Sequence, residues 1–454
     1  MRTYELKKVP GIPLYEALYQ CLREDIRRGE LAPGEKLPSK RALAQHLEVS
    51  KITVEAAYNQ LLSEGYIRSR EKIGYFVEDG HQHAPIPPAA VTEEEELPAI
   101  LDLTANGSAY FPFSVWSKLQ REVMADLGES LLRPMDNQGC AELRRAIAQH
   151  LAAFRGMQVR PENVIIGAGT DFLYNLLIQL LGREKIYALE EPGYEKIRKI
   201  YAAGGVDCVS ATMDENGVRP NALGSARVLH ISPSHHFPTG LVTPIGRRQE
   251  LLRWAEERDG YIIEDDYDSE FRFHSHPLPA LYSLDRQGRV IYMNSFSKSL
   301  TPAIRISYMI LPDGLLEEYR KNLGFYSCTV ASFQQYTLAR FLSRGYFEKH
   351  INRMRKFYKT RRNRVAQALA ECPWKDRLTV REKDAGLHFL VQVDTHLSDE
   401  KIMNIWEKAG IRVQMLSSFY HGNVPTQDTG MLVINYSGLE EDQLCRLKTL
   451  IPHP

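Results

Sequence analysis

Residues 163–177 read NVIIGAGTDFLYNLL and place three patterns in immediate succession. The β-branched run from Asn163 to Ile166 predicts a strand, and the apolar spacing from Phe172 to Leu177 predicts a helix. Between them lies the turn Gly167-Ala168-Gly169-Thr170-Asp171. Small residues let backbone N–H groups approach an anion at a helix N-terminus, so this turn predicts a phosphate-binding loop.

The same alternation of strand and helix continues along the chain. Further β-branched runs lie at residues 185–189, 228–231, 260–264 and 290–293, separated by helical patterns. Strands that alternate with helices are typical of α/β folds with a largely parallel sheet, and their ligands bind at the carboxyl ends of the strands. We therefore expect an α/β domain with its site at those strand ends.

Two of these strand ends carry residues with chemistry to offer. Asp265 follows the run at 260–264, and Ser295-Phe296-Ser297-Lys298 follows the next run, with Arg305 further on. A lysine beside two hydroxyls, with an arginine nearby, suits Schiff-base chemistry combined with a bidentate phosphate clamp. Two plainer alternatives stay open, because Asp265 also suits a structural cap and Lys298, taken singly, also suits the surface.

Length and composition limit the class of protein. The 454 residues predict two or three domains, and 43% hydrophobic with 25% charged residues excludes wholesale disorder. The sequence has no long uncharged apolar run and no charged leader followed by an apolar one, so we expect a cytoplasmic protein without a membrane partner. The six cysteines form no C-x-x-C pair, which argues against zinc fingers and disulfide frameworks.

One break in composition divides the chain. Residues 79–98 are rich in proline, alanine and acid, including the run Glu94–Glu96, and they have no periodicity. Prolines stiffen such a segment and like charges extend it, so it predicts a linker between a domain at 1–78 and one at 99–454. The alternative is a long surface loop within a single domain.

The first 78 residues show a helix-turn-helix pattern. Apolar spacing predicts a helix from Leu14 to near Gly29, a short second helix capped by Ser39, and a third capped by Ser50. A hairpin is expected at residues 66–77. The third helix is expected to face the core mainly through Ile52, Val54, Ala57, Tyr58, Leu61 and Leu62.

Cations occur where a helix disfavours them. Lys40 and Arg41 fall in the first turn of the second helix, and Lys51 in the first turn of the third. The helix dipole disfavours cations there by up to about 1 kcal/mol, and a docked phosphate would reverse that cost. The positions favour DNA contact, with solvated surface cations as the alternative. Lys+Arg and Asp+Glu are equal at 57 each, so any such surface must be local.

These residues resemble the winged helix-turn-helix domain of the GntR family. The shared motifs are Leu37-Pro38-Ser39, Val49-Ser50, Thr53-Val54, Glu64-Gly65-Tyr66-Ile67 and Gly74-Tyr75-Phe76-Val77. The resemblance and the helix pattern together give the expected DNA-binding residues as Ser39, Lys40, Arg41, Ser50, Lys51 and Thr53, with Lys72 and Gly74 at the wing tip. Ile52 and Glu55 depart from relatives, which often have a hydroxyl and an arginine there.

The second part resembles the fold-type I aminotransferases, which use pyridoxal 5′-phosphate. The motifs are Ser295-x-Ser297-Lys298 with Pro302 and Arg305, Glu191-Pro192-Gly193-Tyr194, and Pro238-Thr239-Gly240. The resemblance implies that Lys298 is the catalytic lysine and binds the cofactor as a Schiff base, and that Asp265 pairs with the pyridinium nitrogen. It further implies that Tyr267 contacts the 3′-oxygen and that Tyr194 stacks on the ring. The implied phosphate contacts are Gly169, Thr170, Ser295, Ser297 and Arg305, and Asp171 is a further expected cofactor-binding residue.

A GntR-like winged helix joined to such a domain is the arrangement of the MocR/GabR regulators, and residues 264–272 and 234–240 resemble that family in particular. The resemblance implies a head-to-tail homodimer that binds promoter repeats and senses a small molecule. That effector is either pyridoxal 5′-phosphate itself or an amino compound.

Three departures from working aminotransferases favour sensing over turnover. Phe237 replaces an asparagine, Val433 replaces an arginine that grips the substrate carboxylate, and Pro134 stands where a tyrosine is expected. An aminotransferase with an accessory DNA-binding domain is the alternative. His235-His236 and His274-x-His276 lack the further ligands of a metal site, so we expect no metal.

Overall fold

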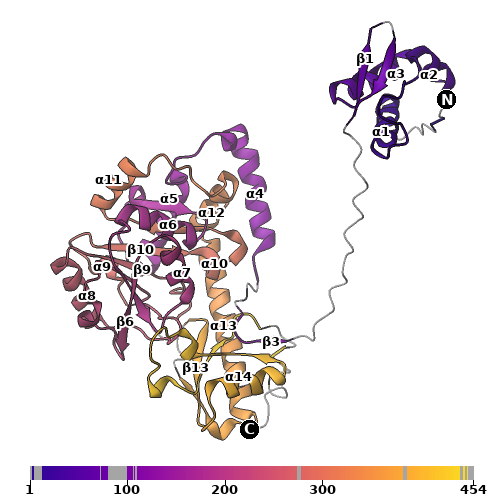
Figure 1. Cartoon of the computed structure of the whole chain (residues 1–454). Coiled ribbons are helices and arrows are strands. Elements are labelled where there is room, and N and C mark those ends of the chain that lie inside the picture. The colour runs from indigo at the N-terminus through magenta and orange to yellow at the C-terminus, as the bar shows by residue number, and fades with distance from the viewer. Residues whose placement is uncertain are drawn as a thin grey trace. The chain divides into compact units, whose positions relative to one another are not determined.

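A computed structural model describes residues 3–4, 13–71, 73–79, 100–105, 107, 110–273, 278–381, 386–439, 443–444 and 447. The chain divides into two compact units, Met1–Glu96 and Leu97–Pro454 (Figure 1). Apart from Asp79, the predicted linker at 79–98 lies outside the described residues, and its role stays a prediction.

The described residues of the first unit form three helices followed by a hairpin. They are α1 (Leu14–Arg27), α2 (Lys40–His46), α3 (Lys51–Ser63), β1 (Ile67–Arg70) and β2 (Gly74–Val77). Its core contains Leu22 of α1, Leu43 of α2 and Tyr58 of α3. The winged helix-turn-helix prediction is confirmed, and both predicted caps form. Ser39 Oγ accepts from Ala42 N at 3.2 Å, and Ser50 Oγ accepts from Thr53 N at 3.0 Å.

The prediction that Ile52 faces the core is wrong. Its side chain is 77% exposed, whereas Val54, Ala57 and Leu61 are buried. Successive helical residues turn by about 100°, so Ile52 points to the side opposite Val54.

The second unit is built on an eight-stranded sheet with the order β4-β11-β10-β9-β8-β5-β6-β7 among the described residues. The strands are β4 (Val164–Gly167), β5 (Tyr187–Glu191), β6 (Cys208–Asp214), β7 (Gly217–Val218), β8 (Val228–Ile231), β9 (Tyr261–Asp265), β10 (Val290–Ser295) and β11 (Ser307–Ile310). Pairing is parallel from β10 through β9, β8 and β5 to β6, while β11 is antiparallel to both of its neighbours. The predicted largely parallel α/β sheet is confirmed.

Helices bury both faces of this sheet. In β4, Ile165 packs in one cluster with Leu173 and Leu177 of α6 (Thr170–Leu181). Its neighbours Val164 and Ile166 pack in another cluster, with residues of α5 (Ala141–Arg155) and α12 (Ser332–Ser343). Alternate residues of a strand point to opposite faces, so a sheet covered on both faces needs the continuous apolar runs of this sequence.

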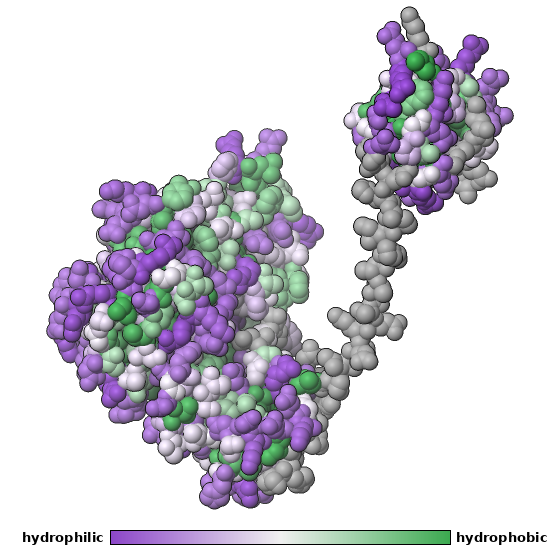
Figure 2. Space-filling view, in the orientation of Figure 1, coloured by the Kyte–Doolittle hydropathy of each residue, from purple (hydrophilic) through white to green (hydrophobic). Residues whose placement is uncertain are grey.

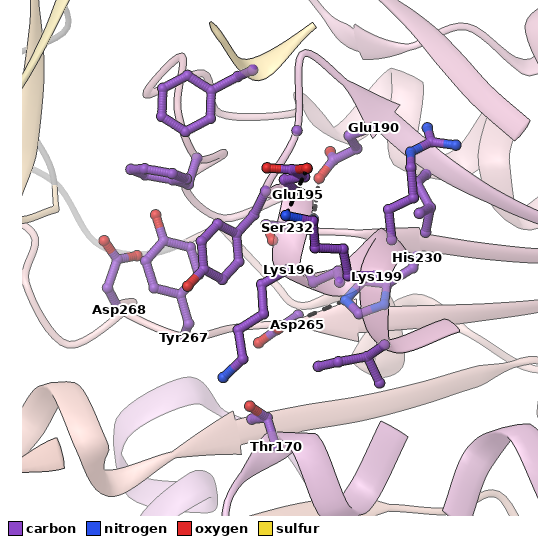
Figure 3. Close-up of a pocket in the computed structure, with 18 of the residues that line it drawn as sticks. Thr170, Glu190, Glu195, Lys196, Lys199, His230, Ser232, Asp265, Tyr267 and Asp268 are labelled. Atoms are coloured by element: carbon purple, nitrogen blue, oxygen red, sulfur yellow. Dashed lines mark hydrogen bonds and ion pairs between the residues drawn. The ribbon is translucent and has the colours of Figure 1, made fainter. Parts of the chain in front are cut away.

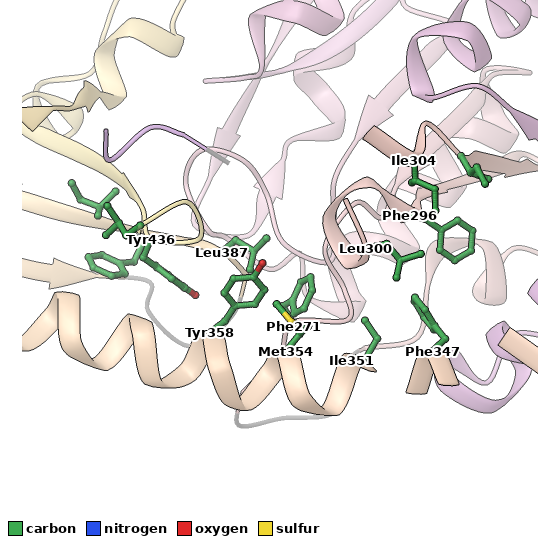
Figure 4. Packing of buried hydrophobic residues seen from close by; sticks show 14 of the residues in the cluster. Phe271, Phe296, Leu300, Ile304, Phe347, Ile351, Met354, Tyr358, Leu387 and Tyr436 are labelled. Carbon is green, nitrogen blue, oxygen red and sulfur yellow. The ribbon is translucent and has the colours of Figure 1, made fainter. Parts of the chain in front are cut away.

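The last part of the chain forms a smaller layer beside this sheet. It contains α13 (Tyr346–Glu371), α14 (Asp399–Lys408) and an antiparallel sheet of β12 (Leu378–Arg381), β13 (His388–Val393), β16 (Met431–Asn435) and β15 (Gln414–Met415). One side of α13 packs against the large sheet and the C-terminal strands; Figure 4 shows Phe347, Ile351, Met354 and Tyr358 facing Phe296, Leu300, Phe271, Leu387 and Tyr436. This packing fixes α10 (Phe296–Ser299), which contains Lys298.

Two expectations from composition can be compared with the described residues. None of the described helices combines the length and apolar character that a membrane span needs. The described cysteines, Cys21, Cys140, Cys208, Cys328 and Cys372, are free of disulfides, as expected.

Candidate functional site

A cavity of about 730 Å³ opens at the carboxyl ends of the parallel strands (Figure 3). All but one of the predicted cofactor residues line it: Thr170, Asp171, Tyr194, Asp265, Tyr267, Ser295, Ser297, Lys298 and Arg305. The exception is Gly169, which lies next to the lining residue Arg305. Strand order brings these residues together from four segments distant in sequence.

Lys298 has an altered acidity. Burial lowers its pKa to about 8, although the nearby Asp268 carboxylate opposes that shift. The position of the short helix α10 is secured from outside, because His350 Nε2 donates to Ser299 O at 2.8 Å. The amine is therefore held at a fixed place and is neutral far more often near pH 7 than an exposed lysine, as a nucleophilic amine requires.

Asp265 presents a buried oxygen with nothing bound to it. Its Oδ2 accepts from Tyr174 OH at 2.6 Å, and His230 Nε2 lies 3.6 Å from the same oxygen. His230 Nδ1 in turn lies 2.7 Å from Tyr201 OH. The other carboxylate oxygen, Oδ1, is buried and makes no hydrogen bond among the described residues. A buried acceptor in this state is ready for an N–H donor such as a protonated pyridine nitrogen.

The opposite end of the cavity suits an anion. Gly169 caps the N-terminus of α6 with φ +91°, and a Cβ there would lie 2.2 Å from Arg305 Nη2. Glycine is needed both for this backbone conformation and for the approach of Arg305. Ser295 Oγ donates to Ser297 Oγ at 2.9 Å, which places two hydroxyls together in the lining.

Asp171 pairs with two cations at the anion-binding end of the cavity. Its carboxylate lies 3.4 Å from Arg305 Nη2 and 2.9 Å from Lys196 Nζ. A carboxylate repels a phosphate, so the side chain of Asp171 orients the two cations instead of contacting the anion itself.

Tyr267 lies in a buried polar group. Its hydroxyl is 3.3 Å from His235 Nδ1, which is also 2.8 Å from Asp268 Oδ2. Burial raises the pKa of the Tyr267 phenol well above its ordinary value, so the phenol keeps its proton. His388 stands 4.8 Å from His235, ring to ring, and donates to Pro238 O. The phenol is thus a fixed donor in the cavity wall.

The wall where an amino-acid carboxylate would be expected is apolar. Val433 is 4% exposed and belongs to a cluster with Leu390, Leu416, Phe419 and Met431. Phe237 packs against this cluster, with its ring 5.2 Å from that of Phe419.

Tyr194, expected to stack on a cofactor ring, is 51% exposed and meets the Phe237 ring edge-on at 5.8 Å. Its side chain is free to turn toward a bound group, because half of its surface is open.

In the first unit, the three predicted DNA-binding cations of α2 and α3 differ in their surroundings. Arg41 and Lys51 are exposed at the starts of α2 and α3. Lys40 is instead engaged: its Nζ lies 2.6 Å from Glu55 Oε1 and 5.3 Å from the centre of the Tyr75 ring.

The remaining predicted DNA-binding residues follow the caps and the wing. The hydroxyls of Ser50 and Thr53 lie 2.8 Å apart beside the start of α3. Gly74 has φ +133° at the start of β2, and Lys72 lies outside the described residues.

Among the described residues no cluster has the composition of a metal site. One ring nitrogen of His236 is hydrogen-bonded, since Nδ1 lies 2.7 Å from Thr239 Oγ1. Residues His274 and His276 lie outside the described residues.

Several residues that line the cavity were not predicted from the sequence. Tyr174, His230 and Glu190 all line the cavity and contact its polar groups. Tyr174 lies four residues after Thr170, so helical spacing on α6 indicates that both face the same side. His230 had no comparable signal, because its proximity to Asp265 depends on β8 lying beside β9.

Comparisons with known proteins agree with both units. The family model for aminotransferase class I and II matches residues 98–449, and that for bacterial regulatory proteins of the gntR family matches residues 14–77. The crystal structure of a kynurenine aminotransferase from Pyrococcus horikoshii superimposes with a TM-score of 0.68 at 24% identity, covering 79% of this chain and 91% of that one. This structural likeness supports the fold.

Relatives with both parts are regulators. The chain is 37% identical over 448 residues to YdeL, an uncharacterized HTH-type transcriptional regulator of Bacillus subtilis, covering 97% of this chain and 96% of that protein. It is 32% identical to the probable rhizopine catabolism regulatory protein MocR of Rhizobium meliloti, covering 96% and 92%. It is 31% identical to the pyridoxine biosynthesis transcriptional regulator PdxR of Corynebacterium glutamicum, covering 94% and 92%. With this similarity over nearly its full length, the chain belongs to the MocR-type HTH transcriptional regulators, in which a GntR-family winged helix precedes an aminotransferase class I/II domain.

Proposed function

We propose that the aminotransferase-like domain of this regulator binds pyridoxal 5′-phosphate and that occupancy of the site alters promoter binding. The observation that carries the proposal is the convergence of three features in one cavity: the half-buried Lys298 with its lowered pKa, the unbonded buried oxygen of Asp265, and Arg305 beside the N-terminus of α6. These features match the aldehyde, the ring nitrogen and the phosphate of the cofactor.

Each residue has a role that follows from its surroundings. When bound, pyridoxal 5′-phosphate supplies an electrophilic carbon and an electron-accepting ring. Lys298 provides the amine, and Asp265 Oδ1 accepts the ring N–H. The Tyr267 phenol donates to the ring oxygen. The phosphate is held by Arg305, by the Ser295 and Ser297 hydroxyls, and by backbone N–H groups at Gly169 and Thr170.

Sensing fits this cavity better than turnover of amino acids. A charge-assisted arginine–carboxylate pair is worth roughly 1.5–3 kcal/mol, and the apolar wall at Val433 provides no such pair. The effector is therefore the cofactor itself or an amino compound that binds without an arginine–carboxylate pair. Steady transamination of an amino acid with a keto acid would favour the rival function, an aminotransferase with an accessory DNA-binding domain.

DNA binding is assigned to the α2–α3 face. Arg41 and Lys51 meet phosphates, Thr53 lies at the groove edge, and Ser39 and Ser50 present their helix N-termini. Lys40 supports this face through Glu55. Lys72 and Gly74 are assigned to the wing.

We also infer a head-to-tail homodimer. Large apolar side chains are open to solvent on the second unit, with Phe113 at 72%, Leu132 at 75% and Phe325 at 76% exposed. We infer that these three side chains belong to the surface that the partner subunit covers. Light scattering of the full chain should give twice the monomer mass, and Leu132→Ser with Phe325→Ser should lower it toward the monomer.

Absorption spectroscopy tests the cofactor assignment. The chain loaded with pyridoxal 5′-phosphate should absorb in the visible, and Lys298→Ala should lose that band while keeping its thermal unfolding transition. The variant Lys196→Ala serves as a control, because it removes an amine of the same cavity that is paired with Asp171. An unchanged band in Lys298→Ala would refute the assignment.

A further inference from the structure

Ile52 is the most exposed large apolar side chain of the described DNA-binding unit, at 77%. It occupies the second position of α3, directly after the exposed Lys51. The N-terminal residues of a recognition helix are those that reach base edges. Figure 2 shows hydrophilic residues with hydrophobic ones among them on the visible face of this unit.

Beyond Ile52 the outward face of α3 has a small apolar residue followed by a polar one. Val54, Ala57, Tyr58 and Leu61 are buried on the inward face. Four residues after Ile52, the half-buried Ala56 lies on the outward side, and the exposed Asn59 follows on it. Ile52 and Ala56 are about 6 Å apart along the helix axis, which is about two base-pair steps.

This face has no arginine, and its single lysine, Lys51, stands at the first position of the helix. The sequence of α3, KITVEAAYNQLLS, contains no arginine. The carboxylate of Glu55, which would also repel phosphates, is held by Lys40 at 2.6 Å. Arginine or lysine to guanine is the commonest specific contact in the major groove, whereas apolar groups contact the thymine methyl and asparagine pairs with adenine.

We propose, on the basis of the DNA-binding function proposed above, that α3 selects A·T base pairs and that Ile52 contacts the C5-methyl group of a thymine. Ala56 provides a second, smaller apolar contact one turn further along, and Asn59 has the chemistry for adenine. Lys51 contributes affinity through a phosphate and leaves the choice of base to its neighbours.

The test removes the methyl group alone. Duplexes are first selected from a random-sequence library by the full chain, with and without pyridoxal 5′-phosphate, and each thymine of a recovered duplex is then replaced by deoxyuridine. Burial of one methyl group corresponds to roughly a fourfold change in affinity. We expect one replacement per half-site to weaken the unmodified chain by about that factor. Ile52→Ala should bind the thymine duplex more weakly and lose its sensitivity to that replacement.

Lys51→Ala is the matched control: it should weaken binding yet keep the full sensitivity to the methyl group. Unchanged sensitivity in Ile52→Ala, or tolerance of every replacement by the unmodified chain, would overturn the inference while leaving DNA binding intact; in that case Ile52 is a protein-contact residue. Failure of the unmodified chain to enrich any duplex would instead refute the DNA-binding function, and the inference with it.

Discussion

The lowered pKa of Lys298 predicts how fast the cofactor-free chain takes up pyridoxal 5′-phosphate. With a pKa of about 8 in place of 10.5, roughly one-tenth of the amine is neutral at pH 7, against about one part in 3,000 for an ordinary lysine. The neutral amine is the nucleophile. Relative to Nα-acetyl-lysine, the chain should therefore gain about 300-fold in reactive amine at pH 7, and this advantage should shrink above pH 8.

Stopped-flow absorbance at a series of pH values measures the rate of pyridoxal 5′-phosphate uptake by the chain and by Nα-acetyl-lysine. The ratio of the two rates is compared, because ionisation of the cofactor affects both rates equally. Asp268 raises the pKa of Lys298, so Asp268→Asn should move the midpoint below 8. Glu195→Gln is the matched control, because it neutralises another carboxylate of the cavity that is paired with Lys199 at 2.9 Å. A midpoint near 10.5, or one that rises in Asp268→Asn, would refute the reasoning.

Five other substitutions test separate parts of the structure. Arg41→Ala and Lys51→Ala should each weaken DNA binding and lower the slope of log affinity against log salt by about one, as fluorescence anisotropy measures; unaltered slopes would exclude the phosphate contacts. Gly169→Ala should lower the cofactor affinity in spectrophotometric titration, because alanine is strained at φ +91° and its Cβ would displace the Arg305 guanidinium; full affinity would contradict the proposed phosphate end. Val433→Arg should lower the amino-acid concentration that shifts the visible spectrum of the loaded chain by about tenfold to a hundredfold; a response of the unmodified chain at micromolar concentration would show that the carboxylate is held elsewhere. Burial raises the pKa of the Glu190 carboxyl from 4.5 to about 8, so its contribution to stability is present at low pH and is lost as pH rises across that interval. The stability of Glu190→Gln relative to the unmodified chain should then increase from pH 5 to pH 8 in denaturant titrations, and a pH-independent difference would count against this.

Local patterns were sufficient for much of the fold. Ser39 and Ser50 cap helices because their hydroxyls accept backbone N–H groups within the same turn, which is a short-range event. The strand expected at 185–189 instead spans Tyr187–Glu191. Two glutamates end the apolar pattern early, but the strand continues because the backbone at Glu190 and Glu191 still pairs with β6. Their carboxylates accept from Ser232 N and His421 N.

The candidate site, too, could be predicted from the sequence only in part. Motifs on single segments, such as Ser295-x-Ser297-Lys298, predicted residues that do line one cavity. The hydrogen bonds that Tyr174 and His235 make to Asp265 and Asp268 depend on contacts between distant segments, which periodicity along the chain does not encode. The prediction for Ile52 was wrong for another reason, since an exposed apolar residue looks like a core residue in a hydrophobicity pattern.

Coupling between cofactor and DNA tests the account most directly. The affinity of the full chain for a selected duplex is measured with and without pyridoxal 5′-phosphate and a panel of amino compounds, in parallel with Lys298→Ala. We expect the affinity of the unmodified chain to change when the cofactor is added, and that of Lys298→Ala to stay constant. Equal responses of the two chains, or no response of either, would contradict the claim that occupancy at Lys298 governs promoter binding.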